Sequence, residues 1–103
     1  MNRLIVALLF LFVAGALAEE ASAADARKGE TLARRWCASC HIVSSDQQRG
    51  MTQSPPFSAI ANTPGFNQAT LAFFLLAPHP RMPDMNLSRS EASDLAAYIA
   101  MQK

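Results

Sequence analysis

The sequence lacks three features that would indicate other classes of protein. It has too few cysteines for a cysteine-based zinc site, too little net charge for a nucleic-acid binder, and no apolar run long enough to span a membrane. A zinc site built on its two cysteines would need two further ligands, and no other cysteine exists. Charged residues make up 17% of the chain and nearly cancel to +1, which is far from the basic excess of a nucleic-acid binder. The N-terminal apolar run, Leu4 to Ala18, falls short of the roughly 20 residues that span a bilayer.

That apolar run has the form of a secretory signal peptide, which we predict for residues 1–23. Arg3 supplies the positive start, and small-x-small cleavage sites end at Ala18 and Ala23. We expect cleavage after Ala23, because Asp25 then caps the first helix of the mature chain. An uncleaved anchor is the alternative. After cleavage we expect no membrane span.

Residues 24–103 are then one domain, and losing the signal peptide raises the formal net charge from +1 to +2. No nucleic-acid partner is expected at that charge. A domain of about 80 residues has a marginal hydrophobic core, so a buried apolar cofactor would add surface that the chain lacks.

The motif Cys37-Ala38-Ser39-Cys40-His41 identifies such a cofactor. Two thiols three positions apart, followed at once by a histidine, are the attachment signature of a c-type haem. Each thiol can form a thioether with one vinyl group, and His41 would be the proximal iron ligand. A redox disulfide or dithiol is the alternative for Cys37 and Cys40, although nothing in the sequence predicts the βαβ context of a thioredoxin-like motif.

A second axial ligand is expected from the proline-rich stretch after residue 77. We expect Met82, because the prolines on either side restrict the backbone that holds its thioether. Met85 is the second choice, and His79 is also open. A His/Met-ligated iron carries electrons and has a raised potential, whereas an open sixth site binds gases.

The remaining pattern predicts an all-α fold of three main helices around one covalent haem c, without strands. We expect helices from Asp25 to Trp36, from Gln68 to Leu76, and from a capping box that begins at Ser88. Phe57, Ile60 and Ala61 should form a helical turn against the haem.

These motifs together resemble a small bacterial class I (mono-haem) cytochrome c over nearly all of residues 25–103. The resemblance is carried by Gly29, eight residues before Cys37, and by three stretches: Pro55-Pro56-Phe57, Leu71 to Pro83, and Leu87 to Ile99. It implies Met82 as the axial ligand.

The resemblance also implies two contacts and contains one departure. The first and last helices should cross at Gly29, near Leu95 and Tyr98. The carbonyl of Pro55 should accept the Nδ1 proton of His41. Many family members have an aromatic residue where this chain has Ala33. We therefore expect Trp36 to fill part of that space.

The function implied is a periplasmic one-electron carrier, an electron-transfer protein rather than an enzyme. Export agrees with the chemistry, because bacteria join haem to exported apoproteins outside the cytoplasm. We expect a monomer whose redox partners are a dehydrogenase, an oxidase or other cytochromes. The alternatives are the haem c subunit of a periplasmic dehydrogenase or oxidoreductase complex, and a gas-binding haem protein.

A weakly basic docking face is expected around the haem edge, formed by Arg34, Arg35 and Arg81. The alternative is apolar docking through a rim of Ile42, Val43 and Met85.

Overall fold

Four α-helices make up the regular structure of the computed structural model, which describes residues 23–77 and 81–103. They are α2 (Ala26–Trp36), α3 (Phe57–Ala61), α4 (Gln68–Leu76) and α5 (Arg89–Ala100). No strand occurs among the described residues, and the predicted all-α class is confirmed. The predicted signal peptide lies almost wholly outside the described residues, as does His79.

The helices begin where the sequence predicted, because each long helix has a side-chain cap. Asp25 accepts hydrogen bonds from the first N–H groups of α2, and Asn67 accepts one from Thr70 at the start of α4. At α5, Ser88 and Glu91 form the predicted capping box, with both bonds at 3.0 Å. Each of these caps joins residues no more than three positions apart, so the sequence alone can mark where the helices begin.

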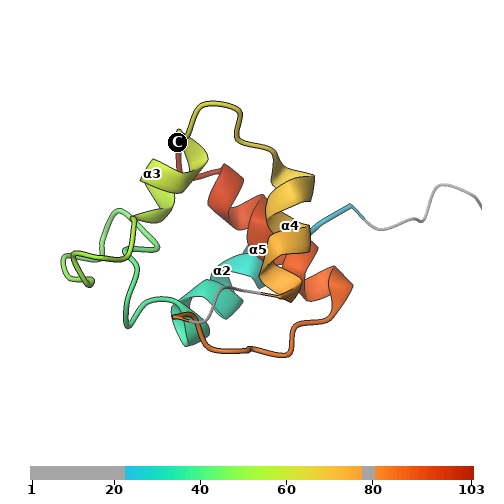
Figure 1. Cartoon of the computed structure of the whole chain (residues 1–103), viewed down its shortest axis with the longest axis horizontal. Coiled ribbons are helices and arrows are strands. Elements are labelled where there is room, and N and C mark those ends of the chain that lie inside the picture. Colours follow the sequence, from blue (N-terminus) through green and yellow to red (C-terminus); the bar gives the residue numbers. More distant parts are fainter. Residues whose placement is uncertain (1–22, 78–80) are drawn as a thin grey trace, which may run out of the picture.

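Helix α5 lies at the centre of the fold and packs against α2, α4 and α3 (Figure 1). Its inner face carries the predicted core residues, each no more than 2% exposed: Ala92, Leu95, Ala96 and Ile99. Two polar contacts join α5 to distant parts of the chain. The Asp94 carboxylate accepts the N–H of Asp25 at 2.7 Å, and the Tyr98 hydroxyl donates to the Val43 carbonyl at 2.7 Å.

The crossing of α2 and α5 takes place at Gly29, as the family resemblance implied. A Cβ atom at Gly29 would lie 2.6 Å from the Asp94 carbonyl carbon, still closer to its oxygen, and 2.8 Å from the Tyr98 Cβ. Only glycine permits this approach, which explains why α2 tolerates a residue of low helix propensity.

The expectation that Trp36 fills space beside Ala33 is wrong. Ala33 is fully buried in the core, whereas Trp36 is 37% exposed. The guanidinium of Arg35 lies over the indole ring, 5.1 Å from its centroid. Trp36 is the last residue of α2, about two turns beyond Gly29, and so it lies past the crossing.

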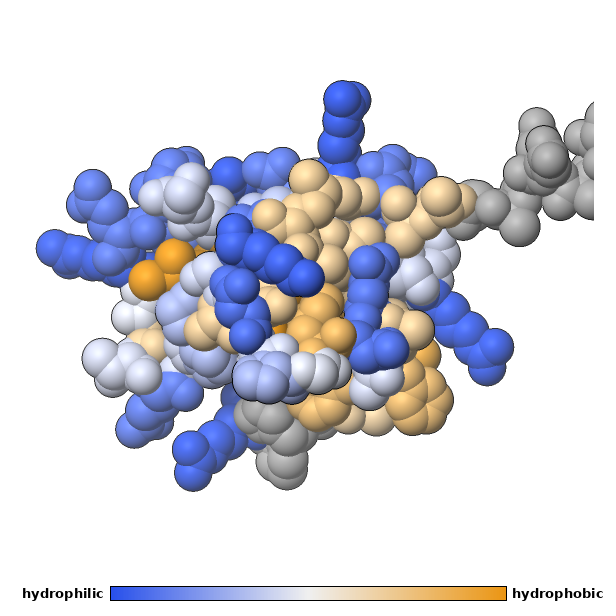
Figure 2. All heavy atoms as spheres, turned by 90° about the horizontal axis from the view of Figure 1, so that it is seen from above, coloured by the Kyte–Doolittle hydropathy of each residue, from blue (hydrophilic) through white to orange (hydrophobic). Residues whose placement is uncertain are grey.

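Apolar side chains also reach the surface, and Figure 2 shows one face on which they gather between polar ones. The large exposed hydrophobic residues include Met51, Phe73 and Phe74, of which Phe73 is 78% exposed. Phe73 and Phe74 belong to α4, a nine-residue helix that is apolar on all sides. Across residues 23–77 and 81–103, no helix combines the length and apolarity needed to span a bilayer.

Candidate haem-binding site

The haem motif (residues 37–41) forms a tight turn at the C-terminal end of α2. Cys37 is the C-cap of the helix. Its carbonyl accepts the N–H groups of both Cys40 and His41, at 3.1 and 2.8 Å. The turn therefore brings the two thiols and the imidazole to one place directly after the helix.

The two thiols are free and lie in different surroundings. Cys37 is buried and belongs to the hydrophobic core, while Cys40 is half-buried. Burial, and then the charge on Cys40, raise the pKa of the Cys37 thiol to about 11. An apolar surrounding of this kind suits the edge of an apolar macrocycle and disfavours a free thiolate.

His41 is oriented by a hydrogen bond between its Nδ1 and the Pro55 carbonyl, 2.6 Å apart. A carbonyl only accepts, so Nδ1 carries the proton and Nε2 keeps its lone pair for a metal. This is the contact that the family resemblance implied. The Phe57 ring lies 5.6 Å from the imidazole and contacts Tyr98 of α5, so the imidazole is backed by the core.

One cavity of about 210 Å³ joins the haem motif to the methionine loop (residues 81–87). Cys37, Cys40 and His41 line it, as does Met82 from the methionine loop, more than 40 positions later in the chain. The remaining lining residues are Trp36, Ser39, Met51, Gln53, Ser54, Pro55, Arg81, Pro83 and Met85. Two thiols, an imidazole and a thioether are the donor set of a His/Met-ligated haem c, so the residues present fit that group.

Both candidate methionines line the cavity, but they differ in burial. Met85 is 7% exposed and belongs to the hydrophobic core. Met82 is half-buried and only packs against that core.

Two predicted haem contacts lie outside the cavity lining. Phe57 is 3% exposed and sits behind His41, and Ile60 is half-buried against the core. Conversely, Met51 lines the cavity, although it was not among the expected site residues. Met51 lies in the aperiodic polar stretch after the motif, where no sequence signal marks a residue as part of the site.

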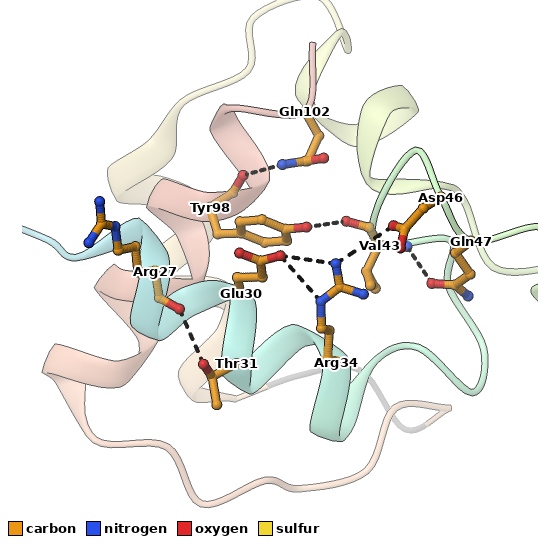
Figure 3. A network of polar contacts seen from close by, with 9 residues as sticks. All are labelled: Arg27, Glu30, Thr31, Arg34, Val43, Asp46, Gln47, Tyr98 and Gln102. Carbon is orange, nitrogen blue, oxygen red and sulfur yellow. Dashed lines mark hydrogen bonds and ion pairs between the residues drawn. The ribbon is translucent and has the colours of Figure 1, made fainter.

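The expected charged rim is only partly present. Arg34 pairs with Glu30 at 3.0 Å and lies 3.6 Å from Asp46, so its charge is already balanced (Figure 3). Arg35 stacks on Trp36, and Arg81 lines the cavity. The alternative apolar rim is contradicted, because two of its three residues are buried: Val43 at 1% and Met85 at 7%.

Comparison with known proteins agrees with this site. A family profile described as "Cytochrome C oxidase, cbb3-type, subunit III" matches residues 24–99. Cytochrome c-552 from Bradyrhizobium diazoefficiens is 54% identical to the chain over 79 residues, which are 77% of this chain and 76% of that protein. No solved structure matches the chain. The family match covers well over half of the chain, and the chain therefore belongs to the cytochrome c family of haem-binding electron-transfer proteins.

Proposed function

We propose that the protein is a periplasmic one-electron carrier with a single haem c. Cys37 and Cys40 hold the haem through thioethers, and His41 and Met82 are the axial ligands. The supporting observation is the cavity that joins the Cys-x-x-Cys-His motif to the methionine loop. The haem motif and the methionine loop lie far apart in the sequence, so nothing local forces them to line one cavity. A disulfide or dithiol function for the cysteines would not need the methionine loop there.

Bound haem would supply one-electron chemistry at its iron, and the chain would hold the ligands still. The Pro55 carbonyl fixes the tautomer of His41 and increases its basicity toward a metal. Pro83 restricts the backbone beside Met82. Two ligands retained in both oxidation states keep the structural change small, which favours rapid electron transfer.

Burial supports Met82 over Met85 as the second ligand. Met85 already packs in the core, so turning its sulfur toward a metal would open space among its neighbours. Met82 can turn its thioether into the cavity at a smaller cost, because it is half-buried at the cavity wall.

Replacing each methionine in turn tests this assignment. Met82→Ala should abolish the long-wavelength absorption band of ferric iron–thioether bonding and lower the midpoint potential, since a sulfur ligand favours ferrous iron. Met85→Ala is the matched control and should lose stability while keeping the band. The opposite pattern would assign the ligand to Met85.

One intact mass measurement on the protein purified from whole native cells, membranes included, tests attachment, haem number and signal cleavage together. We expect the mass of residues 24–103 plus one haem, retained under denaturing conditions. A chain beginning at Glu19 would place cleavage at Ala18 instead. An unmodified chain would refute covalent attachment, and a chain retaining residues 1–23 would identify an anchor.

A second candidate function is a haem c subunit of a periplasmic dehydrogenase or oxidoreductase complex. It is favoured by the exposed Phe73 and Phe74 on α4, since an apolar surface of this kind is typical of a protein contact. The matching family description also names an oxidase subunit. A free carrier should elute from native extract as a monomer, whereas a subunit should co-elute with its partner.

A further inference from the structure

The backbone that carries His41 is held by contacts other than regular secondary structure. Residues 38–43 contain turns but no helix or strand, so their carbonyl groups need donors from elsewhere. Two of these carbonyls accept backbone N–H groups. The Met51 N–H donates to the Cys40 carbonyl at 2.7 Å, and the Phe57 N–H donates to the Ile42 carbonyl at 2.9 Å. Side chains serve three others, at Ala38, His41 and Val43.

Gln47 alone supplies the donor for two of those three carbonyls. Its Nε2 lies 2.9 Å from the Ala38 carbonyl and 2.8 Å from the His41 carbonyl. The same nitrogen lies 2.7 Å from the Arg49 carbonyl, so its two hydrogens are shared among three acceptors. Its Oε1 accepts the N–H of Val43 at 3.0 Å. One half-buried side chain therefore contacts both sides of the ligand histidine.

Val43 continues this chain of contacts into the core. Its side chain is 1% exposed, its N–H donates to Gln47, and its carbonyl accepts from the Tyr98 hydroxyl of α5 (Figure 3). Gln47 also follows Asp46, which faces Arg34 of α2 at 3.6 Å. The Gln47 amide is thus linked through Val43 to α5, while its neighbour Asp46 contacts α2.

We propose that Gln47 is a positioning residue for the haem ligand His41. The Pro55 carbonyl orients the imidazole ring, and Gln47 holds the main chain from which that ring extends. This inference rests on the proposed function, because it takes His41 as the iron ligand. It adds a role for a residue in a polar loop that makes no direct contact with the cavity.

Two substitutions separate the donor and acceptor halves of the amide. Gln47→Met keeps the length of the side chain, removes both amide donors and replaces the amide oxygen by a thioether that accepts only weakly. Gln47→Glu keeps the acceptor for Val43 but places a carboxylate against the Ala38 and His41 carbonyls, to which it cannot donate. Gln48→Met is the matched control, since Gln48 is an exposed neighbour in the same loop.

The readouts are the g values of the low-spin ferric protein, which report ligand geometry, and hydrogen exchange at the Val43 amide. Gln47→Met should speed Val43 exchange about fivefold or more, in line with the loss of one intramolecular hydrogen bond. Both Gln47 variants should show shifted or split g values while far-UV circular dichroism keeps the wild-type helix content. Gln48→Met should match the wild type in every readout.

The inference would be overturned if both Gln47 variants had the same g values as the wild type and the same rate of hydrogen exchange at the Val43 amide. Changes that only accompany a loss of helix would also overturn it, since Gln47 would then stabilise the fold without positioning the ligand. A wild-type protein that lacks the low-spin signal of two axial ligands would instead refute the proposed function. If the wild type shows the low-spin signal and the Gln47 variants match the wild type in g values and Val43 exchange, only the positioning role of Gln47 is refuted and the proposed function stands.

Discussion

Replacing Gly29 by alanine should destabilise the protein, although alanine is the better helix former. The added methyl group would meet the main-chain carbonyl of Asp94 and lie 2.8 Å from the Tyr98 Cβ. Neither obstacle is the end of a flexible side chain. Relief therefore requires α2 and α5 to move apart at the centre of the core, where Ala33 and Leu95 are fully buried.

The expected loss follows from two opposing terms. Overpacking a well-packed core costs about 1–3 kcal/mol, and an immovable backbone obstacle places Gly29→Ala at the upper end of that range. Alanine regains about 1 kcal/mol relative to glycine in a helix interior. The net loss should be about 2 kcal/mol, or a melting temperature lower by about 10 °C for a domain of this size.

Chemical unfolding of the haem-loaded protein, followed by far-UV circular dichroism, measures this loss. Lys28→Ala is a suitable control, because Lys28 is an exposed neighbour in the same helix. The control should unfold within about 0.5 kcal/mol of the wild type. A Gly29→Ala protein as stable as the wild type would show that the two helices can separate without cost, which would refute the close-packing argument.

Three other predictions concern contacts of single side chains. Tyr98→Phe should cost about 1–3 kcal/mol in urea unfolding, because it leaves the buried Val43 carbonyl without the donor now 2.7 Å away. The Ser88 N–H, then its hydroxyl, hold the pKa of Glu91 below its usual 4.5, so the capping box stabilises α5 above about pH 4.5 and loses this effect as pH falls through the lower folded value. Glu91→Gln should therefore reduce the loss of helix in acid, seen by circular dichroism. Arg35→Glu, beside the cavity, should slow low-salt electron transfer to a redox partner more than Arg27→Glu does, and high salt should remove the difference.

The helix starts and the haem motif were predictable because they depend on residues close together in the chain. An N-cap such as Asp25 bonds N–H groups two and three positions later. The Cys-x-x-Cys-His motif closes its turn through bonds of three and four positions. The α2–α5 crossing was predictable for another reason: the family resemblance implied it at Gly29, where a Cβ atom would meet the Asp94 carbonyl.

The sequence by itself determined the helical elements and the placing of two thiols and an imidazole on one turn, because periodicity, capping and motif spacing act over short distances. Only the tertiary structure decided that Trp36 lines the cavity instead of filling the helix crossing. It also decided that the Gln47 side chain meets the Ala38 and His41 carbonyls and that Val43 meets Tyr98, 55 positions away. The physical reason is that an irregular segment must find its hydrogen-bond partners wherever the fold brings them, and no local pattern records that choice.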